Sequence, residues 1–166
     1  PKFLLLENVS ALLSARHKAN FEEWQLVLKS MGYHNHIYCL NATDFGLPQN
    51  RYRLLMLSVL VENDEQKDTL EKYFKNHDLA NEEYRKTLSI PDSNLADYLR
   101  TDYTNNQYYK EALECQPNNT ESRQKIWENN LQITDMSGNI IAERVATLTT
   151  KQDRHPNSGN LYLNFN

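Results

Sequence analysis

Three strand-like runs in the first part of the chain limit the folds that it can adopt. Residues 3–6 are all apolar, residues 33–40 alternate as a strand would, and residues 51–61 form a second apolar run. Each has the length and pattern of a β-strand. Between the first two, residues 21–31 repeat apolar side chains at helical spacing, and Gly32 follows, as glycine often does after a helix. A strand, a helix and a strand in this order predict part of an α/β sheet.

The composition changes after residue 61. Residues 62–86 are strongly charged with periodic apolar side chains, which predicts an exposed helix, and Asn20 is the expected cap of the first helix. The sequence therefore predicts the late strands of a Rossmann-like sheet over residues 1–61, a connecting helix over 62–86 and a small, irregular α+β region over 87–166. Within this last region we expect short helices from a cap at Asp92 or Ser93 to Leu99, over 108–113 and over 122–127, and strands over 131–133, 140–141, 145–149 and 161–165.

The bulk properties favour a globular protein. The chain has 166 residues, 39% of them hydrophobic and 24% charged, and no apolar run is long enough to span a membrane. Its two cysteines are too few for a disulfide framework and favour a reducing compartment. The net charge of −4 argues only weakly against a nucleic-acid partner, because a local basic loop can act regardless of it. Since a strand begins at once and no Met precedes it, we expect a fragment of a longer protein.

Glu7 and Asn8 directly follow the first apolar run. In open α/β sheets, ligands bind at the carboxyl ends of the strands, so a carboxylate at this position is well placed for acid–base chemistry. Taken alone, the pair is more simply explained by a Glu7 that only caps the next turn.

A second polar group lies in the segment Gly-Leu-Pro-Gln-Asn-Arg-Tyr-Arg, residues 46–53. If this segment is extended, Gln49, Arg51 and Arg53 share one face. Two guanidinium groups and an amide on one edge could hold a phosphate or a base carbonyl. The alternative is that the two arginines are solvated side chains at the entrance of a strand.

Together, the two segments resemble the cytosine-5 DNA methyltransferase family. Glu7-Asn8-Val9 matches the Glu-Asn-Val motif of that family, and Gln49, Arg51 and Arg53 match its Gln-x-Arg-x-Arg motif. The residues that lead into the second motif match as well, at Leu40-Asn41-Ala42 and Gly46-Leu47-Pro48. This resemblance extends over residues 1–61.

The resemblance implies methyl transfer from S-adenosylmethionine to C5 of a cytosine in double-stranded DNA. In this family a cysteine thiolate adds to C6, and negative charge then builds on N3 and O2 of the base. Glu7 would bond to N3 and the exocyclic amine, and Arg53 would lie at O2. Arg51 would hold the base or the neighbouring backbone, and Asn8 would orient the loop that bears the nucleophile. The cytosine must leave the duplex stack to reach these groups.

Three features of the family are missing from this sequence. The nucleophile of the family follows a proline, whereas Tyr38 precedes Cys39 and Glu114 precedes Cys115. The four glycines are isolated and form no glycine-rich cofactor motif, and the late Pro-Arg-Glu motif of the family is not reached. We therefore expect S-adenosylmethionine to be bound mainly by an N-terminal half of the catalytic domain, on the same or a separate chain. Without that half, this chain should be inactive.

Residues 146–163 also resemble the family, at the position where its target-recognition region begins the DNA-reading loops. The segment is rich in side chains of the types that read base edges or phosphates. They are Lys151, Gln152, Asp153, Arg154, His155, Asn157 and Ser158. An ordinary polar hairpin loop is the alternative.

Other residues carry weaker hypotheses. The four tyrosines between positions 98 and 109 could stack on bases, but the packing of a small helical region explains them more simply. Trp24 and Trp127 are expected in the core on their helices. His34 and His36 share a face of a strand, but no complete ligand set is evident, so we predict no metal site.

The resemblance predicts a fragment or subunit of a bacterial DNA (cytosine-5-)-methyltransferase. Such an enzyme would act in a restriction–modification system, in the cytoplasm and close to the nucleoid. One alternative is a non-catalytic DNA-recognition subunit of a split methyltransferase. Another is an unrelated α/β binding module that contains Glu-Asn-Val by chance.

Overall fold

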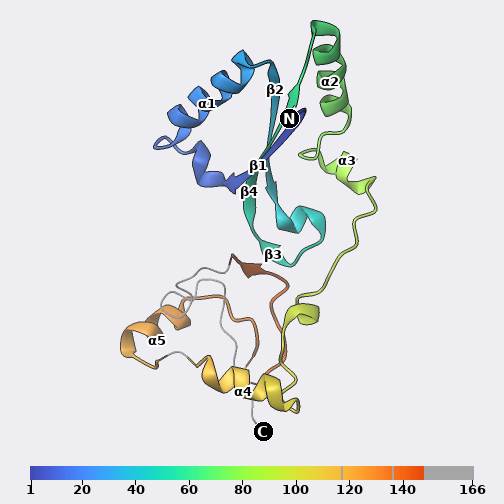
Figure 1. The fold of residues 1–166 in the computed structure, drawn as a ribbon. Helices are drawn as coiled ribbons and strands as arrows, with labels where there is room; N and C mark the ends of the chain where they lie inside the picture. Colours follow the sequence, from blue (N-terminus) through green and yellow to red (C-terminus); the bar gives the residue numbers. More distant parts are fainter. Residues whose placement is uncertain (117, 136, 148–166) are drawn as a thin grey trace. The chain divides into compact units, whose positions relative to one another are not determined.

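The computed structural model describes residues 1–116, 118–135 and 137–147 (Figure 1). The chain divides into two compact units, the first made of residues 1–45 and 52–91 and the second of residues 46–51 and 92–166. The division into functional regions at residues 61 and 86 stays a prediction, because the two units reflect packing alone. In the part of the chain that the structure describes, no helix is long and apolar enough to cross a membrane.

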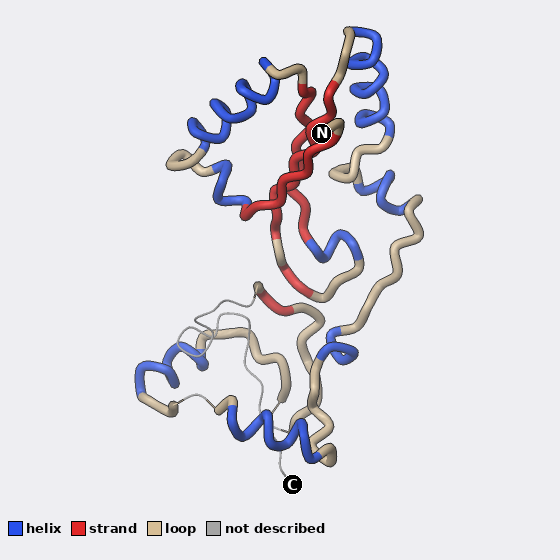
Figure 2. Tube along the Cα trace, in the orientation of Figure 1, coloured by secondary structure: helices blue, strands red, loops and turns tan. Residues whose placement is uncertain are grey.

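The first unit is built on a three-stranded sheet (Figure 2). Strand β4 (Tyr52–Leu60) lies in the middle, between β1 (Phe3–Val9) and β2 (Tyr33–Asn41), and pairs antiparallel with both. Strands β1 and β2 are therefore parallel to each other, and helix α1 (Lys18–Ser30) connects them. This confirms the predicted strand–helix–strand part of an α/β sheet.

Two boundaries differ from the prediction. Strand β1 does not end at Leu6 but continues through Val9, because Glu7 pairs with Leu55 and Val9 pairs with Arg53. Helix α1 begins before the predicted cap Asn20, which lies inside the helix. The cause is a preceding turn, in which the Lys18 amide donates to the carbonyl of Ser14 and helical bonding starts early.

The face of the sheet under α1 forms the main core. Leu54 and Met56 of β4 are 0% and 1% exposed and pack in one cluster with Phe21, Leu28 and Tyr33. Burying a side chain of this size stabilises the fold by about 1.5–3 kcal/mol, so this cluster is the main reason that α1 stays on the sheet.

The prediction that both tryptophans lie in the core is only partly correct. Trp24 was expected in the core but is 40% exposed on the outer side of α1, because Phe21 and Leu28 occupy the buried stripe of the helix. Trp127 is half-buried on α5 (Glu121–Glu128).

The opposite face of the sheet carries α2 (Asp64–Asn76) and α3 (Glu82–Lys86), and Figure 1 shows α1 and α2 on opposite sides of the sheet. One helix was predicted over residues 62–86, but the helical backbone breaks after Asn76. Asn81 caps the second helix by accepting from the amides of Glu83 and Tyr84, at 2.9 and 3.2 Å, which favours a new start at this point.

The second unit contains short elements. Strand β3 (Gln49–Asn50) pairs in parallel with β5 (Val145–Ala146), and α4 (Asn106–Glu114) and α5 lie near the predicted helices. The turn η3 (Leu95–Tyr98) is capped by Asn94 and not by Asp92 or Ser93.

Three predicted strand segments of the second unit have different outcomes. The predicted hairpin is reduced to an isolated antiparallel bridge between Thr134 and Ile140. Of the strand predicted over 145–149, the structure describes residues 145–147. The strand predicted over 161–165 lies outside the described residues.

Candidate active site

The structure brings Glu7 and Arg53 together on one face of the sheet. The Nε of Arg53 lies 2.9 Å from Oε1 of Glu7, and Nη1 donates to the carbonyl of Tyr52 at 2.8 Å. Glu7 lies opposite Leu55 and Arg53 opposite Val9, so the ion pair crosses diagonally between β1 and β4. The register of two strands, rather than a local turn, therefore positions the pair.

The two partners differ in exposure. The side chain of Glu7 is 57% exposed, whereas that of Arg53 is 21% exposed. The cross-strand neighbours of Arg53 on the same face are Val9 and the buried Leu40, which favour the aliphatic stem of the arginine along an apolar surface. A held guanidinium thus stands beside a carboxylate that an incoming ligand can reach.

The Glu7–Arg53 pair places two complementary hydrogen-bonding groups at one point. A carboxyl group can accept hydrogen bonds or, when protonated, donate one, whereas a guanidinium only donates. A planar ligand with a nitrogen and a carbonyl oxygen on adjacent ring positions would fit such a pair.

Glu7 does not cap the next turn, because the N-cap of the turn η1 (Ser10–Leu13) is Val9 and no side chain caps it. The capping alternative is therefore wrong.

Asn8 points to the other face of β1. Its pairing partner is Leu54, which lies in the core under α1. The Oδ1 atom of Asn8 accepts from the amide of Val9 at 2.8 Å, so this side chain fixes the end of the strand.

Gln49 and Arg51 belong to the second unit. Gln49 lies on β3, opposite Val145, and Arg51 follows β3 with a half-buried side chain that also has a partner. Arg53 thus pairs with Glu7 within the first unit, whereas Arg51 belongs to the second unit. The predicted DNA-reading residues Lys151, Gln152, Arg154, His155 and Asn157 lie outside the described residues.

Late residues of the chain hold the segment that carries Gln49 and Arg51. The amide of Val145 donates to the carbonyl of Pro48 at 3.0 Å, and the hydroxyl of Thr147 donates to the carbonyl of Asn50 at 2.8 Å. The amide of Ser93 also donates to the carbonyl of Gly46, at 2.9 Å. These contacts of Ser93, Val145 and Thr147 could not be predicted from the sequence, because their spacing from this segment forms no recognisable pattern.

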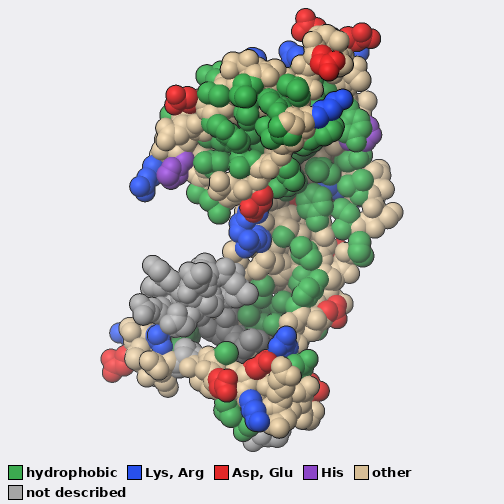
Figure 3. Space-filling view, viewed as in Figure 1, with side chains coloured by type: hydrophobic (Ala, Val, Ile, Leu, Met, Phe, Trp, Pro, Cys, Tyr) green, Lys and Arg blue, Asp and Glu red, His purple; other side chains and the backbone are tan. Residues whose placement is uncertain are grey.

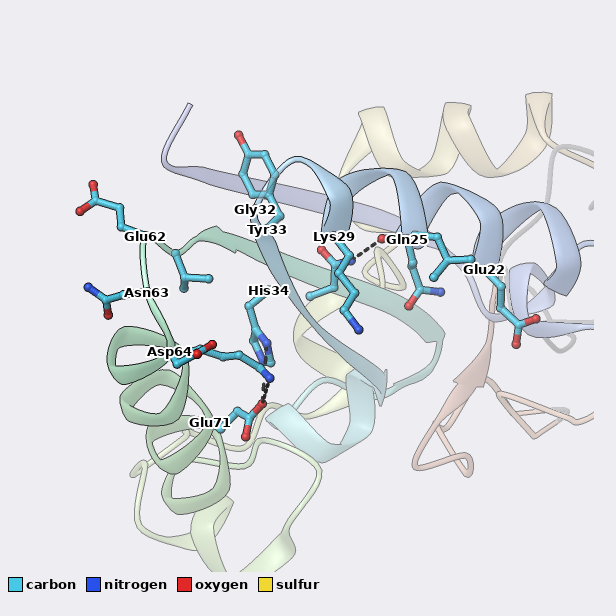
Figure 4. Close-up of a pocket in the computed structure, with 14 residues that line it drawn as sticks. Glu22, Gln25, Lys29, Gly32, Tyr33, His34, Glu62, Asn63, Asp64 and Glu71 are labelled. Atoms are coloured by element: carbon cyan, nitrogen blue, oxygen red, sulfur yellow. Dashed lines mark hydrogen bonds and ion pairs between the residues drawn. The ribbon is translucent and has the colours of Figure 1, made fainter.

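An open groove of about 900 Å³ lies elsewhere on the first unit, between α1, the start of β2 and α2 (Figure 4). It includes residues 33–35, which pair with residues 58–60 of β4. Glu7 and Val9 pair with Leu55 and Arg53, at the other end of the same strand. The groove is therefore separate from the ion pair. Over residues 1–116, 118–135 and 137–147, no group of three or more His, Cys, Asp or Glu side chains could hold a metal ion.

A model of the family described as C-5 cytosine-specific DNA methylase matches residues 1–162. The chain belongs to this family. This match overturns the alternative of an unrelated binding module with a chance Glu-Asn-Val.

Two bacterial members of the methylase family are clearly similar to part of the chain. Type II methyltransferase M2.ScrFI of Lactococcus lactis subsp. cremoris is 48% identical over 65 residues, which are 39% of this chain and 18% of that protein. Orphan methyltransferase M.SssI of Spiroplasma monobiae is 48% identical over 62 residues, which are 37% of this chain and 16% of that protein. These matches thus cover less than a fifth of the length of either relative.

A solved structure shows the same fold. The Entamoeba histolytica methyltransferase EhMeth superposes on 97% of this chain and 39% of its own, with a TM-score of 0.50 and 16% sequence identity. At this identity the likeness concerns the fold alone.

Proposed function

We propose that this chain is part of a DNA (cytosine-5-)-methyltransferase, which transfers a methyl group from S-adenosylmethionine to C5 of a cytosine in a specific duplex site. The observation that carries this proposal is the Glu7–Arg53 pair at 2.9 Å in a chain of the methylase family. The name of the type II relative supports a place in a restriction–modification system. Such a system acts on DNA in the bacterial cytoplasm, close to the nucleoid.

The pair suits the edge of an extruded cytosine. Glu7 would bond to N3 and the exocyclic amine, and Arg53 would donate to O2, so that charge developing on N3 and O2 is relieved at both atoms. Their proximity supports this role, because N3 and O2 belong to adjacent ring positions. Arg51 and Gln49 would hold the base or the neighbouring backbone, and Asn8 would orient the loop with the nucleophile.

DNA recognition would come from residues 151–160, which the sequence predicts to form a polar loop. We assign this function to Lys151, Gln152, Arg154, His155 and Asn157, whose side chains are of the types that contact bases and phosphates.

The described residues do not fit S-adenosylmethionine. The groove beside α1 lies at the far end of the sheet from Glu7, and the glycines of the sequence form no glycine-rich turn. We therefore assign the binding of S-adenosylmethionine to the N-terminal half of the catalytic domain.

The outer edge of β1 supports association with an N-terminal half of the catalytic domain. The described sheet pairs β1 with β4 alone, and Phe3 and Leu5 of β1 are 61% and 74% exposed. Val27 and Met31 on the outer side of α1 are 51% and 62% exposed, and Figure 3 shows a broad apolar area over this part of the first unit. An open, apolar strand edge favours the addition of another strand, which the missing half of the domain could supply.

Reconstitution tests the proposed function. The purified chain is mixed with a polypeptide that carries the Pro-Cys motif and the glycine-rich cofactor motif of the family, and transfer of labelled methyl groups to duplex DNA is measured. We expect no transfer by either chain alone and transfer by the mixture. Methylation by the 166-residue chain without a partner would contradict the proposal.

A matched pair of variants tests the docking edge in the same assay. Leu5→Lys places a charge on the exposed face at the open edge of β1 and should abolish association with the partner. Leu26→Lys changes a similarly exposed leucine, 64% exposed on the groove side of α1, and should leave association intact. Equal association of both variants would exclude this edge as the docking site.

A second candidate is the non-catalytic DNA-recognition subunit of a split methyltransferase. It is favoured by the lack of a Pro-Cys and a glycine-rich motif in the sequence. The coding sequence upstream of Pro1 separates the two: a Pro-Cys motif in the same reading frame indicates one chain, and a stop codon indicates a subunit.

A further inference from the structure

Helix α2 rests on the sheet through a stack of titratable rings. Phe74, the buried residue of α2, lies face to face with His36 of β2, with the ring centroids 4.1 Å apart and the planes at 10°. His34 stacks on the same phenylalanine at 6.3 Å, and Tyr38 meets His36 edge-on at 4.4 Å. The contact between helix and sheet therefore depends on two imidazoles.

A third histidine joins α2 to α3. The His77 ring stacks on Tyr73 at 4.1 Å and meets Tyr84 of α3 edge-on at 5.5 Å. The Nδ1 atom of His77 also lies 2.8 Å from the carbonyl of Tyr73. The two helices thus form one continuous strap over this face of the sheet.

The far end of this strap reaches the turn η2 (Ala42–Phe45). Arg85 of α3 donates to the carbonyls of Leu79 and Ala80, both at 2.9 Å, and its Nη2 lies 3.9 Å from Asp44 in η2. The turn η2 directly precedes residues 46–51. The strap is therefore also held at the turn that follows β2.

The surroundings of His36 disfavour its protonated form. Burial lowers the pKa of His36, and the nearby His34 lowers it further, whereas Asp78 acts in the opposite direction. The face of Phe74 can also attract a cation, but the net shift of the pKa is downward. Burial raises the pKa of Tyr38, so this neighbour is neutral near pH 7 and supplies no compensating charge.

His34 faces a different set of charges. Its Nδ1 lies 3.9 Å from the carboxylate of Glu71, which also pairs with Lys67 at 3.7 Å (Figure 4). Because a carboxylate lies beside His34, we assign the sensitivity to His36.

We propose that α2 and α3 form an acid-released strap, in which protonation of His36 loosens α2 from the sheet while the sheet itself stays folded. Docked α2 disfavours the protonated form of His36, whereas an undocked helix leaves the imidazole in water, where it takes up a proton near its ordinary pKa of about 6.5. Falling pH therefore shifts the population toward the undocked helix as it passes below about 6.5. This inference does not depend on the proposed methyl transfer.

Hydrogen exchange of the full 166-residue chain tests the strap. Protection factors of α2 and β4 amides, corrected for intrinsic exchange, are compared at pH 7.5 and 5.5. We expect a loss of protection in α2 at pH 5.5 with protection in β4 retained. Unchanged protection in α2, or a parallel loss in both elements, would overturn the proposal.

Three variants locate the sensitivity. His36→Phe keeps an aromatic ring against Phe74 without a titrating group and should remove the pH-dependent loss of protection in α2. His36→Gln also removes the titrating group and should have the same effect. It serves as a second variant in case the phenylalanine ring disturbs the stack. His17→Asn, at the exposed start of α1, is the control and should behave as the parent chain. A pH-dependent loss that persists in both His36 variants would also overturn the proposal.

Discussion

At the scale of single residues, the Glu7–Arg53 pair contributes more to a site than to stability. Glu7 is 57% exposed, and exposed ion pairs stabilise a fold by only about 0.2–1 kcal/mol. The ion pair therefore adds little to stability, and we propose ligand binding as its role.

Arg53→Met separates these two contributions, because methionine keeps an apolar stem beside Val9 and Leu40. We expect the free energy of unfolding, measured with urea, to fall by no more than about 1 kcal/mol. Methyl transfer by the complete enzyme should fall about 10²-fold or more through the loss of a donor to O2. Lys18→Met, which breaks the exposed pair with Glu22, is the control and should leave transfer unchanged. A large loss of stability without a loss of transfer would assign Arg53 a structural role.

The identity of these two residues could be predicted from the sequence, because each lies in a motif. Their direct contact depends on the register of β1 against β4, in which Val9 meets Arg53. No local pattern encodes that register. The same limit explains why the hydrogen bonds from Val145 and Thr147 to residues 48–50 were not foreseen.

At the scale of elements, strand β4 carries the core of the first unit. Leu54→Ala should lower the free energy of unfolding by about 2–5 kcal/mol, because Leu54 is 0% exposed and its removal leaves a cavity against Phe21 and Leu28. Chemical denaturation measures this, and Leu26→Ala on the exposed side of α1 should change stability by less than about 0.5 kcal/mol. Similar losses for both variants would mean that β4 is not the centre of the core.

The strands and α1 could be predicted because their apolar patterns are long and regular. Several of the errors lie at the ends of elements. Asn20 is a good capping residue, but the turn before Lys18 starts the helix earlier. The cap at Asn81 divides residues 62–86, which the sequence pattern predicts as one helix. Local hydrogen bonds determine where these helices begin, and several residues compete for the capping position.

At the scale of the whole molecule, residues 46–51 pack with the second unit although both neighbouring segments belong to the first. A motif that is continuous in sequence is thereby divided between two units, with Gln49 and Arg51 in one and Arg53 in the other. Composition changes along the chain could not predict that residues 46–51 belong to the second unit, because this depends on pairing between β3 and β5.

The predicted recognition loop, residues 151–160, yields a prediction at the same scale. In the complete enzyme, Arg154→Ala should reduce discrimination between cognate and scrambled duplexes by about 1–3 kcal/mol, as expected for a lost base contact. Binding titrations at fixed salt measure this. If the wild-type enzyme and the variant each bind both duplexes equally well, the loop does not read the sequence.

The most direct test of the central claim is the rate at which the complete enzyme, formed by this chain and the half that carries the nucleophile, methylates C5 of cytosine with Glu7→Gln. We predict a loss of about 10²–10⁴-fold with DNA binding retained, because the amide cannot supply a proton to N3. Glu23→Gln on the exposed side of α1 should keep the parent rate. Full-rate methylation by the Glu7→Gln enzyme would contradict the role assigned to Glu7.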